Sequence, residues 1–179
     1  MYQREEVTLK RDVGAIVIPD GTPASLQEGE TVWITQELGG SFTVVNQYGG
    51  LFRIDPRNAD ALGKEVETPA EELTSGTLEE RVWSQMKRCF DPEIPVNIVD
   101  LGLVYDCRIE EVEGGDAKVE IKMTLTAPGC GMGPVLAMDV KNRVEEIPGI
   151  GEADVEVVFD PPWNQNMMSE AARLQLGFF

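Results

Sequence analysis

The sequence contains no histidine among its 179 residues. A Ser-His-Asp or Cys-His hydrolase cannot operate within such a chain, because histidine is the base that activates the nucleophile in those enzymes. Zinc and haem sites that use histidine ligands are excluded for the same reason. The absence therefore removes most of the common hydrolase and metalloenzyme classes from consideration.

Basic residues are also scarce. The chain has 15 Lys and Arg against 32 Asp and Glu, which gives a formal net charge of -17 at pH 7. Such a surface repels a phosphate backbone and an anionic membrane surface, so we expect no nucleic-acid or membrane partner. No apolar run approaches the roughly 20 residues that span a bilayer, and the first six residues lack the basic-then-apolar order of a signal peptide.

Only three cysteines are present, at widely separated positions. An odd and scattered set does not form a disulfide framework, which predicts reduced thiols and a cytoplasmic location. Cys89 and Cys107 lie on apolar faces of a helical and a strand pattern, where cysteine behaves as a small hydrophobic residue. Because no Cys-x-x-Cys pair occurs, a zinc site shared by all three cysteines is disfavoured.

The N-terminal third reads as short strands separated by turns. Apolar and β-branched runs at residues 12–19, 31–35, 41–45 and 51–54 are divided by turn signals that include two Gly-Gly pairs. The pairs match no phosphate-binding fingerprint. Residues 1–63 are therefore predicted to form a small all-β domain, a barrel or a sandwich.

The remainder predicts a second domain of mixed type. Residues 64–76 are acidic and lack apolar periodicity, so we expect a linker or covering segment there. Thr77 with Glu80 forms a capping-box pattern at a helix start. A β-hairpin follows, in which Leu103, Tyr105, Cys107 and Ile109 alternate on one face of the first strand, and the apolar alternation of the second strand runs from Ala117 to Leu125. A helix over 134–146, a strand and a final helix from Ser169 come after it. Residues 77–179 are thus predicted to be a compact α-β-β-α-β domain, and the fold class α+β.

Cys130 differs from the other two cysteines because it lies in a loop between a strand pattern and a helix pattern. The loop reads Thr-Ala-Pro-Gly-Cys-Gly-Met-Gly-Pro over residues 126–134, so small residues flank the sulfur. A helix that begins near Pro134 would direct its free N–H groups toward the thiol and favour the thiolate, which binds soft metals and attacks electrophiles. The structural alternative is a small residue that fills a tight turn.

Five further polar or aromatic residues are candidates. Asp91 and Glu93 are held between prolines and could complete a hard metal site or bind a partner, although a helix-ending turn with solvated carboxylates is the favoured interpretation of the local sequence. Asp100 is expected to cap a turn. Thr126 could orient the thiol or a ligand, or serve as an ordinary strand residue. Trp163 is expected to pack on the core rather than contact a partner.

Three segments taken together resemble the SufT-type iron–sulfur assembly proteins. They are Asp-Pro-Glu-Ile-Pro-Val-Asn-Ile-Val-Asp-Leu-Gly-Leu-Val-Tyr over 91–105, the cysteine loop over 123–134, and Asp-Pro-Pro-Trp over 160–163. The C-terminal half is similar to the small domain shared with PaaD and the eukaryotic cytosolic iron–sulfur targeting factors. The N-terminal half, through residues 34–44, is similar to the extra domain of longer SufT proteins.

This resemblance implies a non-enzymatic factor that helps to transfer or insert [4Fe–4S] clusters into apo-proteins. It implies that Cys130 binds the cluster or iron, with Asp91, Glu93 and Thr126 as the polar group around it. Two departures stand near the thiol: Gly131 where many members have proline, and Ala127 where many have a second threonine.

Ligand counting limits the mechanism that the resemblance implies. A cluster usually takes about four thiolates, so one loop cysteine cannot hold it alone. We expect a labile cluster or iron shared across a homodimer, or bridged to a partner or small thiol. Apo iron–sulfur proteins and other assembly proteins are the expected partners. The alternative is an adaptor that binds them without holding iron; a thiol redox enzyme is less favoured, because no resolving cysteine lies nearby in the sequence.

Overall fold

The computed structural model describes residues 4–66 and 69–178, and its chain divides into two compact units, Met1–Glu67 and Thr68–Phe179. Each unit has its own hydrophobic core. Strands and helices are both present, which confirms the α+β class. Among the described residues no helix is long and apolar enough to cross a membrane.

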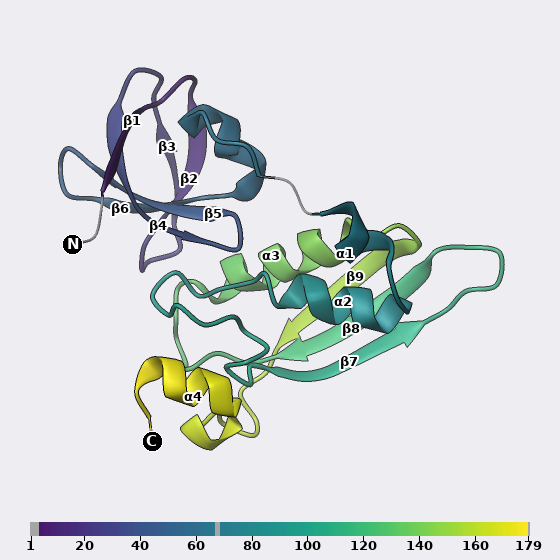
Figure 1. Ribbon diagram of the computed structural model, residues 1–179. Helices are drawn as coiled ribbons and strands as arrows, with labels where there is room; N and C mark the ends of the chain where they lie inside the picture. Colours follow the sequence, from purple (N-terminus) through teal and green to yellow (C-terminus); the bar gives the residue numbers. More distant parts are fainter. Residues whose placement is uncertain (1–3, 67–68, 179) are drawn as a thin grey trace. The chain divides into compact units, whose positions relative to one another are not determined.

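Unit 1 is built on one antiparallel sheet with the strand order β1-β4-β5-β6-β2-β3, followed by a 3-10 helix, η1 (Figure 1). The described strands pair in a single sheet, and the barrel or sandwich arrangement of this domain stays a prediction. Gly39 and Gly40 form the β4–β5 hairpin turn as predicted, both at positive φ. The elements are β1 (Glu5–Thr8), β2 (Val13–Val17), β3 (Pro23–Leu26), β4 (Thr31–Leu38), β5 (Ser41–Asn46), β6 (Leu51–Ile54) and η1 (Pro56–Leu62).

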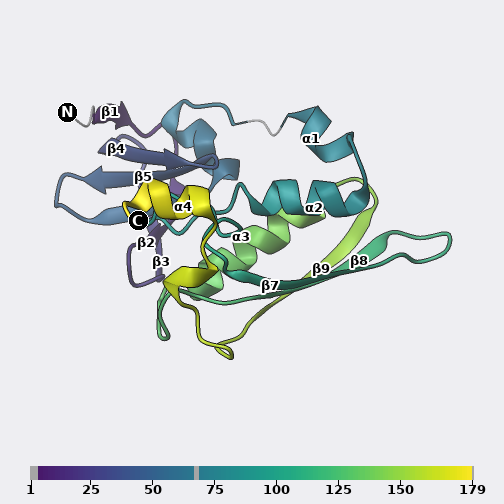
Figure 2. The ribbon, with the colours of Figure 1, turned by 60° about the horizontal axis from the view of Figure 1, so that its bottom comes forward.

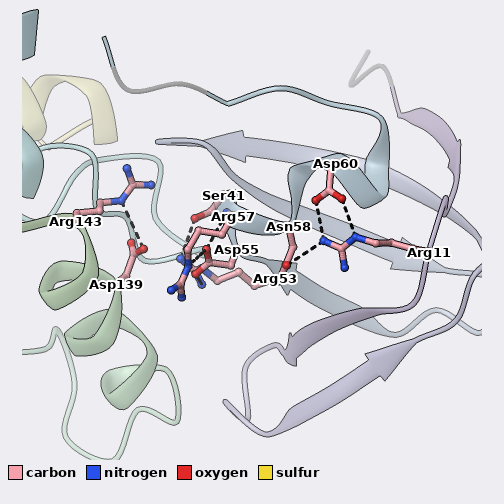
Figure 3. Close-up of polar contacts among 9 residues, drawn as sticks. All are labelled: Arg11, Ser41, Arg53, Asp55, Arg57, Asn58, Asp60, Asp139 and Arg143. Atoms are coloured by element: carbon pink, nitrogen blue, oxygen red, sulfur yellow. Dashed lines mark hydrogen bonds and ion pairs between the residues drawn. The ribbon is translucent and has the colours of Figure 1, made fainter. Parts of the chain in front are cut away.

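Ionic contacts attach η1 to the strands of unit 1. Arg11, which follows β1, pairs with Asp60 at 2.7 Å and donates to the Asn58 side chain at 3.2 Å (Figure 3). Arg53 on β6 donates to Ser41 Oγ at 2.8 Å. The buried residues of η1, among them Leu62, complete the core of the unit.

Unit 2 contains the predicted α-β-β-α-β order, realised as α2-β7-β8-α3-β9, with additional helices before and after it. Its sheet has the order β7-β8-β9; the first pair is antiparallel and the second parallel. Buried residues of α2 and α3 share one core with β8 (Figures 1 and 2). The elements are α1 (Ala70–Thr74), α2 (Leu78–Met86), β7 (Val104–Glu110), β8 (Ala117–Met123), α3 (Gly133–Glu145), β9 (Ile150–Val157), η2 (Gln165–Met167) and α4 (Glu170–Leu176).

Helix α2 begins as the sequence predicts. The Thr77 side chain accepts a hydrogen bond from Glu80 N, and the Glu80 carboxylate accepts one from Thr77 N, which completes the capping box. The segment 64–76, expected as a linker or cover, contains α1, and Glu72 of α1 pairs with Arg88 at 2.6 Å. This ion pair joins α1 to the residues that follow α2.

A β-bulge between Val104 and Asp106 changes which residues of β7 face the core, so the prediction for Tyr105 is wrong. Simple alternation places Tyr105 on the apolar face with Cys107. In the structure Val104 packs against the core together with Cys107 and Ile109. One extra residue reverses the alternation, so Tyr105 leaves the core face. Its hydroxyl donates instead to Pro161 O at 2.7 Å.

Candidate functional site

The loop that carries Cys130 connects β8 to α3 at one end of the unit 2 sheet (Figures 1 and 2). A turn at Pro128 and Gly129 precedes the cysteine, and Gly129 has φ +77°, a conformation that glycine adopts without steric cost. Cys130 is half-buried and its side chain packs partly against the unit 2 core. The thiol is therefore neither fully enclosed nor fully exposed.

Helix α3 begins three residues after Cys130, one residue before the predicted start. Its first residue, Gly133, donates to Cys130 O at 3.1 Å. A Cβ on Gly133 would lie 2.7 Å from Leu125 Cδ1, so glycine permits this close approach. The N-cap residue Met132 accepts no hydrogen bond through its side chain, so no side chain caps the first turn of α3. That the free N–H groups of α3 stabilise the thiolate form of Cys130 stays a prediction.

Asp91 and Glu93 lie in the segment after α2, which emerges at the same end of unit 2 as the cysteine loop (Figures 1 and 2). Asp91 is buried, and its Oδ1 accepts a hydrogen bond from Glu93 N at 2.9 Å. Its carbonyl accepts a second one from Ile94 N at 3.0 Å. Glu93 itself is exposed. The expected helix-ending turn is present, but only Glu93 has a solvated carboxylate.

Thr126 lies beyond the strand on which it was expected. Strand β8 ends at Met123, which leaves Thr126 in the loop with partial exposure. Thr124, which no pattern in the sequence marks as a site residue, is 1% exposed, and its Oγ1 has no hydrogen-bond partner among the described residues. Buried hydroxyls are usually paired. Its place in the alternating pattern resembles that of an ordinary polar strand residue, so the sequence offered no signal.

The other two cysteines are packing residues, as predicted. Cys89 is fully buried, and its sulfur lies 3.8 Å from Gln85 O. Cys107 is half-buried; burial, and then the charges of Glu79 and Asp106, raise the pKa of its thiol to about 11. All three cysteines are free thiols.

The structure does not bring the predicted site residues into a preformed metal site. Across residues 4–66 and 69–178, no three His, Cys, Asp or Glu side chains lie together so that they could hold a metal ion. The structure thus places the Asp91 segment and the Cys130 loop at one end of unit 2 without a closed set of ligands.

Two further motif residues have structural roles. Trp163 packs against the core, as expected, and its Nε1 donates to Leu101 O at 2.7 Å. Asn97, rather than Asp100, caps the turn, because its Oδ1 accepts from the backbone N–H groups of Val99 and Asp100, each at 3.0 Å. Asn97 also donates to Asp100 Oδ2 at 2.7 Å.

Comparison with known proteins assigns the second unit to a family. A family model described as iron–sulfur cluster assembly protein matches residues 79–157. An Fe-S protein maturation auxiliary factor of Porphyromonas gingivalis (strain ATCC BAA-308 / W83) is 42% identical over 100 residues, which cover 56% of this chain and 91% of that protein. The factor YitW of Bacillus subtilis (strain 168) is 37% identical over 100 residues, 56% of this chain and 94% of YitW.

The factor SufT of Staphylococcus aureus (strain USA300) is 41% identical over 87 residues, which cover 49% of this chain and 94% of SufT. The similarity to these three relatives covers about half of the present chain. The resemblance of the N-terminal half to the extra domain of longer SufT proteins stays a prediction. The chain belongs to the family of iron–sulfur cluster assembly proteins.

Proposed function

We propose that this protein is an auxiliary factor in the maturation of iron–sulfur proteins and that it helps to transfer or insert [4Fe–4S] clusters into apo-proteins through Cys130. The names of its relatives support the general role. Three free thiols are consistent with work in the reducing cytoplasm. The role is that of a carrier, so the cluster is cargo and no enzymatic step is required.

The observation that carries the proposal is the contrast among the three thiols. Cys89 is fully buried, and the raised pKa keeps the Cys107 thiol protonated near neutral pH. Iron and clusters bind thiolates rather than thiols, and the binding group must be reachable from outside. Cys130 alone combines partial exposure with a loop position before an uncapped helix start.

One cysteine still supplies only one of about four ligands of a cluster. We propose that the others come from a second copy of this protein, from a partner or from a small thiol. Asp91 and Glu93 on the neighbouring segment, with Thr126 on the same loop, would contribute polar contacts around the thiol. The bond from Glu93 N to Asp91 Oδ1 supports this role, since it fixes one carboxylate oxygen of Asp91.

Anaerobic reconstitution with iron and sulfide tests the proposal on wild type, Cys130→Ala and Cys107→Ala. The last is a matched control that removes a half-buried thiol of raised pKa. We expect wild type and Cys107→Ala to take up iron and sulfide alike, with cluster absorption in the visible range, and Cys130→Ala to take up little. Equal uptake by Cys130→Ala and wild type would contradict the assignment.

The adaptor function is separable from iron binding. An adaptor that holds no iron retains apo-proteins and assembly proteins in pull-downs after Cys130→Ala, and the wild type then takes up no iron. Mass determination under anaerobic conditions locates the missing ligands. A cluster bridged by two copies doubles the 19.7 kDa mass only when iron and sulfide are present.

A further inference from the structure

A cavity of about 190 Å³ lies between helix α4 and the segment that follows α2, away from the cysteine loop residues. Figures 1 and 2 show α4 against this segment. The cavity is much smaller than the roughly 300–1,000 Å³ of pockets that hold a whole small-molecule ligand. Its size suits one long side chain. Its lining residues include Phe90, Pro95, Val96, Asp100, Ala171 and Ala172.

The walls of this cavity combine apolar side chains with polar groups, and one of the polar groups is a carboxylate. Asp100 Oδ2 accepts a hydrogen bond from Asn97 at 2.7 Å, which fixes the orientation of the carboxylate. Among the described residues no lysine or arginine pairs with Asp100. Its side chain is therefore positioned but lacks a cationic partner.

Backbone and side-chain contacts keep the walls of the cavity in place. Ser169 N, at the start of α4, donates to Asp100 O at 2.8 Å. Gln175 Nε2, near the end of the same helix, donates to Pro95 O at 2.8 Å. The helix is thus joined to the opposite wall at both of its ends, so the cavity is largely preformed. Preformed pockets lose less entropy when they bind.

We propose that this cavity is an anchor pocket for a lysine or arginine side chain of a partner protein. Such side chains have an apolar stem and a charged head, which match the apolar part of the walls and the Asp100 carboxylate. The ring of Phe90 adds an attraction for the cation. Arginine in particular is enriched among the residues that contribute most of the binding energy at protein–protein interfaces. The chain's formal charge of -17 attracts basic partners at long range.

The pocket contains neither Cys130 nor the other residues proposed to contact iron, so this inference does not rest on the proposed function. It also gives a role to the Asn-Ile-Val-Asp part of the segment 91–105, because Asn97 and Asp100 both line the cavity.

The test is an NMR titration of the isotope-labelled full chain with Nα-acetyl-arginine-methylamide, which carries the side chain without a charged backbone. The leucine and glutamate analogues serve as matched probes. We expect saturable shifts confined to residues 90–100 and 169–176, weakened by added salt. The glutamate probe should give none, and the leucine probe should bind at least about tenfold more weakly than the arginine probe.

Three variants localise the effect. Asp100→Asn keeps the shape and an acceptor for Asn97, and should weaken arginine binding at least about tenfold. Ala171→Leu fills the cavity with a good helix former and should weaken it similarly without a change of charge. Asp116→Asn removes a carboxylate from the exposed β7–β8 loop and should leave binding unchanged.

Equal binding by wild type and Asp100→Asn, or equal loss in Asp116→Asn, would overturn the proposal. So would tighter binding of the leucine probe than of the arginine probe, which would make the cavity a site for an apolar side chain. Native spectra of both pocket variants outside residues 90–100 and 169–176 establish that they remain folded.

Discussion

The substitution Gly102→Ala tests most directly how the segment 91–105, the longest motif of the chain, is held in place. This glycine has φ +77°, and a Cβ added to it would overlap the backbone carbonyl of Met167. Because backbone cannot move aside as a flexible side chain can, Gly102→Ala must displace either the motif segment or the segment that leads into α4. The substitution therefore combines an unfavourable backbone conformation with a steric conflict.

The two contributions can be separated with a control glycine. Gly114, in the β7–β8 hairpin, has nearly the same backbone angle, φ +74°, but a Cβ there would meet nothing within 4 Å. An alanine in the left-handed region costs about 1–2 kcal/mol, which is all that we expect for Gly114→Ala. Overpacking adds about 1–3 kcal/mol, so Gly102→Ala should lose about 2–5 kcal/mol.

Urea denaturation followed by circular dichroism and by tryptophan fluorescence measures both variants. The fluorescence comes from Trp33, Trp83 and Trp163. The indole of Trp163 is hydrogen-bonded to Leu101 O beside the substituted glycine. We expect a lower midpoint for Gly102→Ala than for Gly114→Ala, with similar slopes. Equal losses of stability in the two variants would refute the close approach between Gly102 and Met167.

Three further predictions concern groups with defined contacts. In alkylation mapped by mass spectrometry at pH 7.5, Cys130 should react and Cys107 should not, and labelling of Cys107 should rise about tenfold per pH unit toward its pKa of about 11; reaction of both at pH 7.5 would contradict this. The hydrogen bond from Arg88 lowers the pKa of Glu72 in the folded protein. At pH values above the unfolded pKa of about 4.3, the contact therefore stabilises the protein by about 0.5 kcal/mol. This stabilisation is lost as the pH falls through the lowered pKa of the folded state. Glu72→Gln should therefore lower stability at pH 7 and leave it unchanged near pH 2 in denaturant titrations. Trp163→Phe should lose about 1–3 kcal/mol in the same assay, because it leaves a backbone carbonyl unpaired; no loss would show that water replaces the bond.

Local signals account for most of what the sequence predicted correctly about the fold. The capping box at Thr77 and the Gly-Gly turn at Gly39 depend on residues within a few positions of each other. The alternating pattern wrongly predicted that Tyr105 faces the core. A β-bulge places one extra residue in β7 relative to β8, and the sequence of β7 alone does not show where that extra residue lies. The end of β8 at Met123 was missed because the apolar alternation continues to Leu125.

The candidate site was predictable only in part, for a similar physical reason. The sequence distinguished Cys130 from Cys89 and Cys107 because periodicity separates loop from core positions. It could not show that Asp91 is buried, since burial depends on contacts with distant segments. It could not show the cavity beside Asp100 either, because that cavity forms only when α4 packs against a segment about 80 residues earlier in the chain.

Hydrogen bonds from the segment 91–105 explain how the partly exposed Cys130 loop can lie beside a part of unit 2 that is held in place. Three hydrogen bonds join the motif to residues about 60 positions later: Tyr105 to Pro161, Leu101 to Trp163, and Asp100 to Ser169. Each involves a backbone group, so each fixes the path of the chain and not only a side chain. Under the proposed function, this bracing keeps the motif in place beside the loop, while the loop's own thiol stays accessible to ligands from a second molecule. A thiol that binds a cluster transiently needs a fixed position to receive the cluster. It also needs to be accessible, because a fully enclosed thiol could not release its cargo.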